Sequence, residues 1–115
     1  ILDESTSMLD PRARHSILEY IKRINEENEI TIISITHDAE ESKYSNDIVI
    51  MNNGRIVFTG DYNLLYAKPD ILNMFNLETP FLERIKNDLN KHLGSEVFKI
   101  TEDERSVVEK ICKLI

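Results

Sequence analysis

The sequence has few of the residues that mark secreted, membrane-spanning or nucleic-acid-binding proteins. Cys112 is the only cysteine among 115 residues, so an internal disulfide is excluded and a reducing, cytosolic setting is favoured. No apolar run approaches the ~20 residues of a membrane-spanning helix, so we expect no direct insertion into a membrane. Only three glycines occur, and none begins or ends the glycine-rich loop that cradles nucleotide phosphates.

Positive charge is also scarce. The net charge of −7 argues against a general nucleic-acid binder, which needs clustered Lys and Arg. The composition, 41% hydrophobic and 30% charged, is ordinary for a globular protein, and the length suffices for one compact domain. Because the chain opens on Ile1 and Leu2, as though within a strand, we expect it to be the later part of a longer polypeptide.

The first eleven residues carry the strongest chemical signal. Two apolar residues lead into Asp3 and Glu4, and a short polar turn follows before Asp10 and Pro11. Adjacent acids at the end of a buried strand are costly, because like charges lie side by side against an apolar sheet. In nucleoside triphosphatases one carboxylate helps to hold Mg²⁺, and a neighbouring acid orients or deprotonates the attacking water. We predict that Asp3 serves Mg²⁺ through water and that Glu4 is the catalytic base; a strand end before a capped helix is the alternative.

A strand–helix–strand unit is expected to organise these residues. Asp10 and Pro11 are typical of a helix start, and the helix should run to about Glu29. The β-branched run 30–35 predicts a strand buried on both faces of a parallel sheet. Parallel strands joined by a helical crossover end at the same edge, where α/β proteins bind ligands. The acidic pair and His37, which follows the second strand, should therefore meet at this edge.

His37 is the third candidate for a catalytic role. An isolated histidine is more often structural than catalytic, but a position beside the acidic pair favours chemistry. An imidazole there can hydrogen-bond the γ-phosphate and the attacking water. Asp38-x-x-Glu41 resembles a helix start, so the segment to about Tyr44 should be a short helix.

The rest of the chain predicts a hairpin and several helices. Asn53-Gly54 between the β-rich runs 47–52 and 55–60 is a strong hairpin signal, because a type I′ turn needs positive φ at both positions. We further expect a short helix capped by Asp61 and another over 70–75. A longer helix should begin at Thr79-Pro80 and end at Gly94, and a brief extended segment should follow over 97–100. Thr101 should open a last helix, whose apolar side includes Cys112.

The region of the acidic pair resembles the Walker B motif and D-loop of ATP-binding-cassette (ABC) ATPases. Those enzymes usually carry Asp-Glu-Pro-Thr or Asp-Glu-Ala-Thr before Ser-x-Leu-Asp; residues 3–10 read Asp-Glu-Ser-Thr-Ser-Met-Leu-Asp, with Ser5 as a mild departure. The family also places a switch histidine after the next strand, where this chain has Ile35-Thr36-His37-Asp38. Three linked features in the family's order are far more specific than one short pattern.

Later segments resemble one group within this family. Residues 54–57 and 60–65 follow the histidine in the order seen in transporter members. Residues 77–81, Leu-Glu-Thr-Pro-Phe, and 100–102, Ile-Thr-Glu, resemble the C-terminal extension of the energy-coupling-factor ATPases, which drive uptake of vitamins and of cobalt or nickel ions. Met8 in the D-loop is common in that group.

The resemblance implies an α/β fold: part of a parallel P-loop NTPase-type sheet with flanking helices and a β-hairpin over residues 1–68, then a helical extension over residues 69–115. It implies ATP and Mg²⁺ at Asp3, Glu4 and His37, and hydrolysis coupled to uptake of a vitamin or metal ion. It places the protein peripherally on the cytoplasmic face of the cell membrane, beside integral membrane transporter subunits. Two ATPase subunits, identical or different, would close over two ATP molecules, and the D-loop would face the second subunit through Ser7, Met8, Leu9 and Asp10.

Several motifs of an ABC ATPase are missing from these residues. The Walker A phosphate loop, the glutamine loop and the Leu-Ser-Gly-Gly-Gln signature are absent, so we expect the 115 residues by themselves to be inactive. Two other classes stay open. One is a nucleic-acid-associated ABC ATPase, although the acidic charge and the short connection from Glu4 to His37 weigh against it. The other is a non-enzymatic dimerisation or interaction module that acts through the helices after Pro69.

Overall fold

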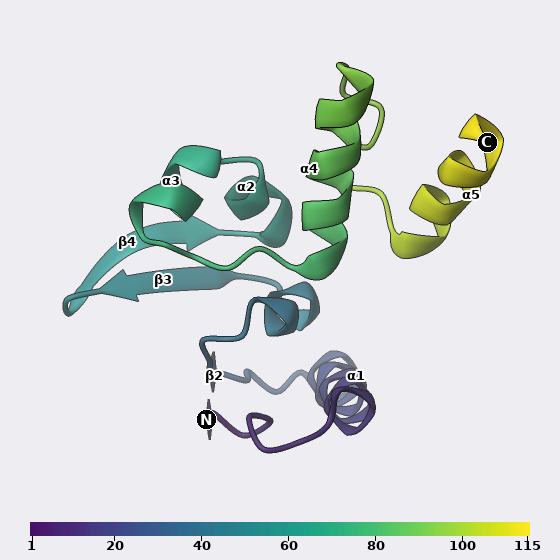
Figure 1. Ribbon diagram of the computed structural model, residues 1–115. Coiled ribbons are helices and arrows are strands. Elements are labelled where there is room, and N and C mark those ends of the chain that lie inside the picture. The colour runs from purple at the N-terminus through teal and green to yellow at the C-terminus, as the bar shows by residue number, and fades with distance from the viewer. The chain divides into compact units, whose positions relative to one another are not determined.

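The computed structural model describes residues 1–115 and has a mixed α/β architecture (Figure 1). The chain forms two compact units, Ile1–Asn46 and Asp47–Ile115, and each has its own two-stranded sheet. The predicted class, with a small parallel sheet, a β-hairpin and C-terminal helices, is confirmed. The predicted subdivision at residue 68, between an ATPase core and an extension, stays a prediction.

The first unit is built as a strand–helix–strand arrangement. β1 (Leu2–Asp3) pairs in parallel with β2 (Ser34–Ile35), and the helix α1 (Pro11–Asn28) connects them. The segment η1 (Ala39–Tyr44) follows as a 3₁₀ helix. The predicted crossover helix and the short helix after it are thus present, the latter in the tighter 3₁₀ form.

The ends of α1 follow from its sequence. Asp10 is the N-cap, and its side chain accepts a hydrogen bond from the backbone N–H of Ala13 at 2.9 Å. Pro11 occupies the first turn, where a missing N–H costs nothing. Glu29 ends the helix with a left-handed φ of 53°. Leu18 is the buried residue of this helix.

The second strand is shorter and more exposed than its sequence predicts. Only Ser34–Ile35 of the run 30–35 pairs as a strand. Ile30, Ile33 and Ile35 are 50%, 55% and 51% exposed, so the expectation of burial on both faces is wrong. The physical reason is size: two short strands form too narrow a sheet for helical layers to cover both faces.

The second unit begins with the predicted hairpin. β3 (Ile48–Asn52) and β4 (Arg55–Gly60) are antiparallel, with a register shift after Ile50 that marks a β-bulge. The turn residues Asn53 and Gly54 have φ angles of 50° and 74°. Both angles are positive, as a type I′ turn requires, so the prediction from this dipeptide is confirmed.

Two short helices supply the core of the second unit. Asp61 caps α2 (Tyr62–Tyr66) by accepting from the backbone N–H of Leu64, as predicted, and α3 (Pro69–Met74) follows. The buried apolar core joins β4 to these helices and consists of Phe58, Leu65, Tyr66 and Leu72.

The helix α4 (Phe81–Leu93) ends at Gly94, which has a left-handed φ of 66° as expected. Its start differs from the prediction, because Pro80 and not Thr79 is the N-cap, and no side chain caps this helix. Pro80 has extended backbone angles, φ −52° and ψ 146°, so helical geometry begins only at Phe81 and Thr79 lies one position too early.

The helix α5 (Glu104–Leu114) also begins later than predicted. Asp103, and not Thr101, is the N-cap, and its carboxylate accepts from the backbone N–H of Ser106. This hydrogen bond to Ser106 holds the pKa of Asp103 below its ordinary value. Aspartate is the stronger of the two capping residues, which explains the shift.

Two smaller expectations for the C-terminal region are also corrected. Residues 97–100 form no strand, although Phe98 is 2% exposed and therefore buried. Cys112 is exposed rather than packed, because the buried side of α5 runs through Val107 and Ile111, one turn apart. None of the helices combines the length and the apolar character that crossing a membrane requires.

Candidate functional site

The paired ends of β1 and β2 bring the predicted catalytic residues to one edge. The backbone N–H of Leu2 donates to the Ile33 carbonyl, and that of Glu4 donates to the Ile35 carbonyl, both at 2.8 Å. This ladder fixes the parallel register of the two strands. Glu4 and His37 both lie just beyond the carboxyl ends of these strands, on neighbouring segments.

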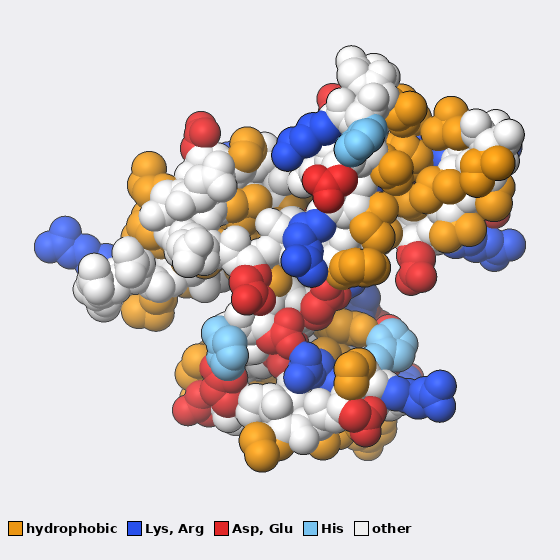
Figure 2. All heavy atoms as spheres, viewed as in Figure 1, with side chains coloured by type: hydrophobic (Ala, Val, Ile, Leu, Met, Phe, Trp, Pro, Cys, Tyr) orange, Lys and Arg blue, Asp and Glu red, His pale blue; other side chains and the backbone are white.

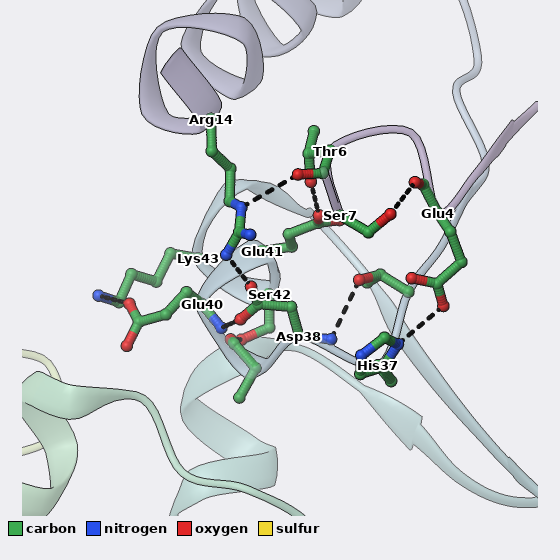
Figure 3. Close-up of polar contacts among 12 residues, drawn as sticks. Glu4, Thr6, Ser7, Arg14, His37, Asp38, Glu40, Glu41, Ser42 and Lys43 are labelled. Atoms are coloured by element: carbon green, nitrogen blue, oxygen red, sulfur yellow. Dashed lines mark hydrogen bonds and ion pairs between the residues drawn. The ribbon is translucent and has the colours of Figure 1, made fainter. Parts of the chain in front are cut away.

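Glu4 and His37 are in direct contact (Figure 3). His37 Nδ1 lies 3.0 Å from Glu4 Oε1, a hydrogen bond that becomes an ion pair when the imidazole is protonated. The Glu4 side chain is 39% exposed and the His37 side chain is 84% exposed, so solvent and a ligand can reach both. A carboxylate oriented by an imidazole at such an edge is suited to general base chemistry.

The turn after β1 holds Glu4 in an unusual backbone conformation. Its φ of 52° lies in the left-handed region, which costs a residue other than glycine about 1–3 kcal/mol. Ser7 stabilises the turn, because its backbone N–H and its hydroxyl both donate to the Glu4 carbonyl, at 3.3 and 2.9 Å. The Glu4 side chain points toward His37 (Figure 3).

Asp3 ends β1 with an exposed side chain beside Glu4. Mg²⁺ in nucleotide sites is usually held by one or two carboxylates, while water and phosphate oxygens complete its octahedron. No group of three or more His, Cys, Asp or Glu residues forms a metal site in the chain. Asp3 and Glu4 carry carboxylate oxygens, the type of ligand that such a site takes from the protein.

The residues predicted for the D-loop form the turn and the start of α1. Met8 is 95% exposed although it is apolar, Ser7 is exposed, and Leu9 is half-buried. Asp10 has the additional role of N-cap of α1. Their place at an interface with a second subunit stays a prediction.

A polar cluster that no sequence pattern revealed lies behind this turn (Figure 3). Arg14 Nε donates to the Thr6 carbonyl at 3.4 Å, and the Arg14 guanidinium forms an ion pair with the Asp38 carboxylate. The Thr6 hydroxyl donates to the Glu41 carboxylate, and these two residues are 1% and 8% exposed. The partners are 24 and 35 positions apart, so local spacing could not have found them.

Asp38 connects this cluster to the segment of His37. Its Oδ1 accepts from the backbone N–H of Glu40 at 2.9 Å and caps η1, while Oδ2 faces Arg14. The Asp38 backbone N–H donates to Thr36 Oγ1 at 3.0 Å. These hydrogen bonds thus hold the chain at Thr36 and Asp38, the residues before and after His37.

At the other end of η1, Tyr44 contacts α1. Its hydroxyl lies 2.5 Å from His15 Nδ1. Burial raises the pKa of Tyr44, and the nearby carboxylates of Glu19 and Glu40 raise it further. The phenol therefore stays protonated at neutral pH and can donate to His15. This contact is a further hydrogen bond between α1 and η1.

Comparisons with known proteins identify relatives of this chain. No protein-family model matches it. The chain is 36% identical over 115 residues to the energy-coupling factor transporter ATP-binding protein EcfA of Pediococcus pentosaceus, covering 100% of this chain and 41% of the relative. It is 36% identical over 114 residues to EcfA1 of Lactobacillus acidophilus, covering 99% and 40%. It is 42% identical over 98 residues to EcfA of Enterococcus faecium, covering 84% and 34%.

Together with the mixed α/β fold, this whole-chain similarity places the chain among the ABC ATPases, where it matches the C-terminal part. Within that family it belongs to the group of energy-coupling factor transporter ATP-binding proteins, as the resemblance of its motifs implied. The chain spans 41% of the length of the Pediococcus relative.

Proposed function

We propose that the chain is part of the ATP-hydrolysing subunit of an energy-coupling-factor importer, in which hydrolysis drives uptake of a vitamin or metal ion. The observation that carries this proposal is the 3.0 Å contact between His37 Nδ1 and Glu4 Oε1 at the carboxyl edge of the β1–β2 sheet. The names of the relatives, which are ATP-binding proteins of such transporters, support it.

The residues of this edge would divide the work of phosphoryl transfer. Mg²⁺, when bound, supplies positive charge that neutralises the phosphates in the transition state. Asp3 would hold the ion, through water. Glu4 would orient the attacking water and accept its proton. His37 would hydrogen-bond the γ-phosphate while its Nδ1 keeps the Glu4 carboxylate in place.

The proposed assembly contains a second ATPase subunit, identical or different, and integral membrane subunits on whose cytoplasmic side the ATPases bind. The exposed turn of Ser7 and Met8 supports the first of these contacts, since it presents the apolar side chain of Met8 to solvent, in the turn that follows the acidic pair. Closure of the pair would exclude water from the site and align Glu4 with the attacking water. The remaining D-loop residues at this contact would be Leu9 and Asp10.

Replacing His37 by alanine in the intact ATPase should lower turnover by about 100-fold, because the γ-phosphate loses a hydrogen-bond donor and Glu4 loses its orienting partner. Phosphate release at saturating ATP measures this. The matched control is His92→Ala, since His92 is an exposed histidine on α4 and its loss should change turnover less than about twofold. Equal turnover of the two variants would contradict the proposal.

A dimerisation or interaction module is the second candidate, and the surface of the C-terminal helices favours it. Figure 2 shows hydrophobic side chains at the surface of α4 and α5. Exposed apolar area of this kind often marks a site of protein interaction. The side chains concerned are 44% to 62% exposed and belong to Phe81, Leu93, Val108 and Leu114.

Gel filtration of the compact unit 47–115 tests this second reading. A module that associates through α4 and α5 should elute as a dimer at micromolar concentration, and Val108→Ser on the exposed side of α5 should shift it to a monomer. If the wild-type unit and the Val108→Ser variant both elute as monomers, the dimerisation reading is contradicted and the ATPase proposal is the one that stands.

A further inference from the structure

One side chain joins the two segments that carry Glu4 and His37. Arg14, near the start of α1, donates through Nε to the carbonyl of Thr6 and forms an ion pair with Asp38 (Figure 3). Thr6 comes two residues after Glu4, and Asp38 directly follows His37. The guanidinium suits this task, because its planar fork of donors can serve two acceptors in fixed directions.

A second link between the same segments is buried. The Thr6 hydroxyl donates to the Glu41 carboxylate, and Glu41 is 8% exposed. A carboxylate withdrawn from water needs such a donor, since an unpaired buried charge is strongly unfavourable. Both links therefore end on Thr6: one on its carbonyl and one on its hydroxyl.

The turn that carries Glu4 needs this support. The β1–β2 ladder is only two residue pairs long. Glu4 has a left-handed φ of 52°, and such a conformation persists only where surrounding contacts over-determine it. Ser7 restrains the turn locally, whereas Arg14 and Glu41 restrain it against the segment of His37.

We propose that Arg14, Thr6 and Glu41 are positioning residues, which hold the Glu4 carboxylate and the His37 imidazole at the separation that hydrolysis needs. This inference rests on the proposed function, in which Glu4 and His37 act on the same water and phosphate. A displacement of about 1 Å at a reacting group lowers rates by as much as about 100-fold. Because the positioning residues act through the turn, their loss should lower kcat and leave the KM for ATP nearly unchanged.

Steady-state ATP hydrolysis by the intact ATPase tests the role of Arg14. Arg14→Ala should lower kcat by about 10- to 100-fold, counted per ATP-binding site, with KM changed less than about threefold. Arg14→Lys retains the charge without the planar fork and should recover only part of the rate. Lys22→Ala, on the exposed face of the same helix, is the matched control and should behave as wild type. A wild-type kcat for Arg14→Ala would overturn the inference.

The buried link provides a second test that holds even where Arg14→Ala fails to fold. Glu41→Gln keeps an oxygen that can accept from the Thr6 hydroxyl, so it should retain most of the wild-type kcat. Glu41→Ala removes the acceptor and should lower kcat by about tenfold or more. Equal kcat values for these two variants, counted per ATP-binding site, would sink the positioning role of Glu41.

Combination with Glu4→Gln separates this inference from the proposed function. Turnover near wild type in Glu4→Gln alone would remove the proposed function, whatever Arg14 does. If Glu4→Gln abolishes turnover and Arg14→Ala does not lower it, only the positioning inference fails. In the Glu4→Gln background, Arg14→Ala should lower the residual rate by a smaller factor than it lowers the wild-type rate, because one of the two groups that Arg14 positions is already gone. A full additive loss there would indicate a purely structural role and overturn the inference.

Discussion

Glu4→Gln in the intact ATPase should lower the rate of ATP hydrolysis by about 100- to 10,000-fold, the range that a positioned general base contributes. Glutamine has the shape of glutamate. Its amide oxygen can still accept a hydrogen bond from His37 Nδ1, which in the wild-type structure lies 3.0 Å from Glu4 Oε1. It cannot accept a proton from the attacking water. ATP binding and closure of the subunit pair should therefore persist while turnover stops.

Phosphate release at saturating ATP and calorimetric titration with ATP measure the two halves of this result. Glu26→Gln is the matched control, because Glu26 is an exposed acid on α1 and has no place at the sheet edge. Its turnover should stay within about twofold of wild type. Turnover of Glu4→Gln within tenfold of wild type would remove Glu4 as the base.

Lys86→Ala should destabilise the second unit by about 3–5 kcal/mol, the effect of breaking a buried ion pair on one side. Lys86 is 1% exposed, and its Nζ lies 2.9 Å from Glu83 Oε1. The same ammonium donates to the carbonyl oxygens of Ile100, at 3.2 Å, and Glu102. Its three N–H donors thus have three acceptors. Alanine would remove the donor of the Ile100 and Glu102 carbonyls and would leave the Glu83 carboxylate with the Tyr62 hydroxyl, at 3.2 Å, as its remaining donor.

Hydrogen exchange in the intact protein measures this effect as the free energy of opening of α4. Lys91→Ala, an exposed lysine on the same helix, should change that free energy by less than about 0.5 kcal/mol. Glu83→Leu combined with Lys86→Met should be less destabilising than Lys86→Met alone, since no charge then stays buried without its partner. Additive losses from the two substitutions would show that Glu83 and Lys86 do not depend on each other.

The turns and most helix ends could be predicted because their causes are local. Asp10 and Asp61 cap helices through a backbone N–H three residues away, and Asn53-Gly54 supplies two positive φ angles in succession. The contact between Glu4 and His37 could also be predicted, because parallel strands joined by a crossover end at the same edge of the sheet. Their catalytic roles stay predictions.

The buried polar contacts of the two units could not be predicted, because each of them involves groups from distant parts of the chain. Charged residues on a helix are expected in water, and nothing in the local pattern indicates that Glu83 and Lys86 are buried. The same holds for Thr6 and Glu41, which form a buried pair across 35 positions. Long-range pairing decides these cases, while periodicity and capping rules describe only neighbours in sequence.

The exposed isoleucines of residues 30–35 have a practical consequence for work on this chain. Ile30, Ile33 and Ile35 are about half exposed, and Ile35 lies in β2, an edge strand of a two-stranded sheet. Such a strand is a template for self-association between copies. Preparations limited to these 115 residues would have to be kept dilute, and light scattering would have to accompany every enzymatic assay made with them.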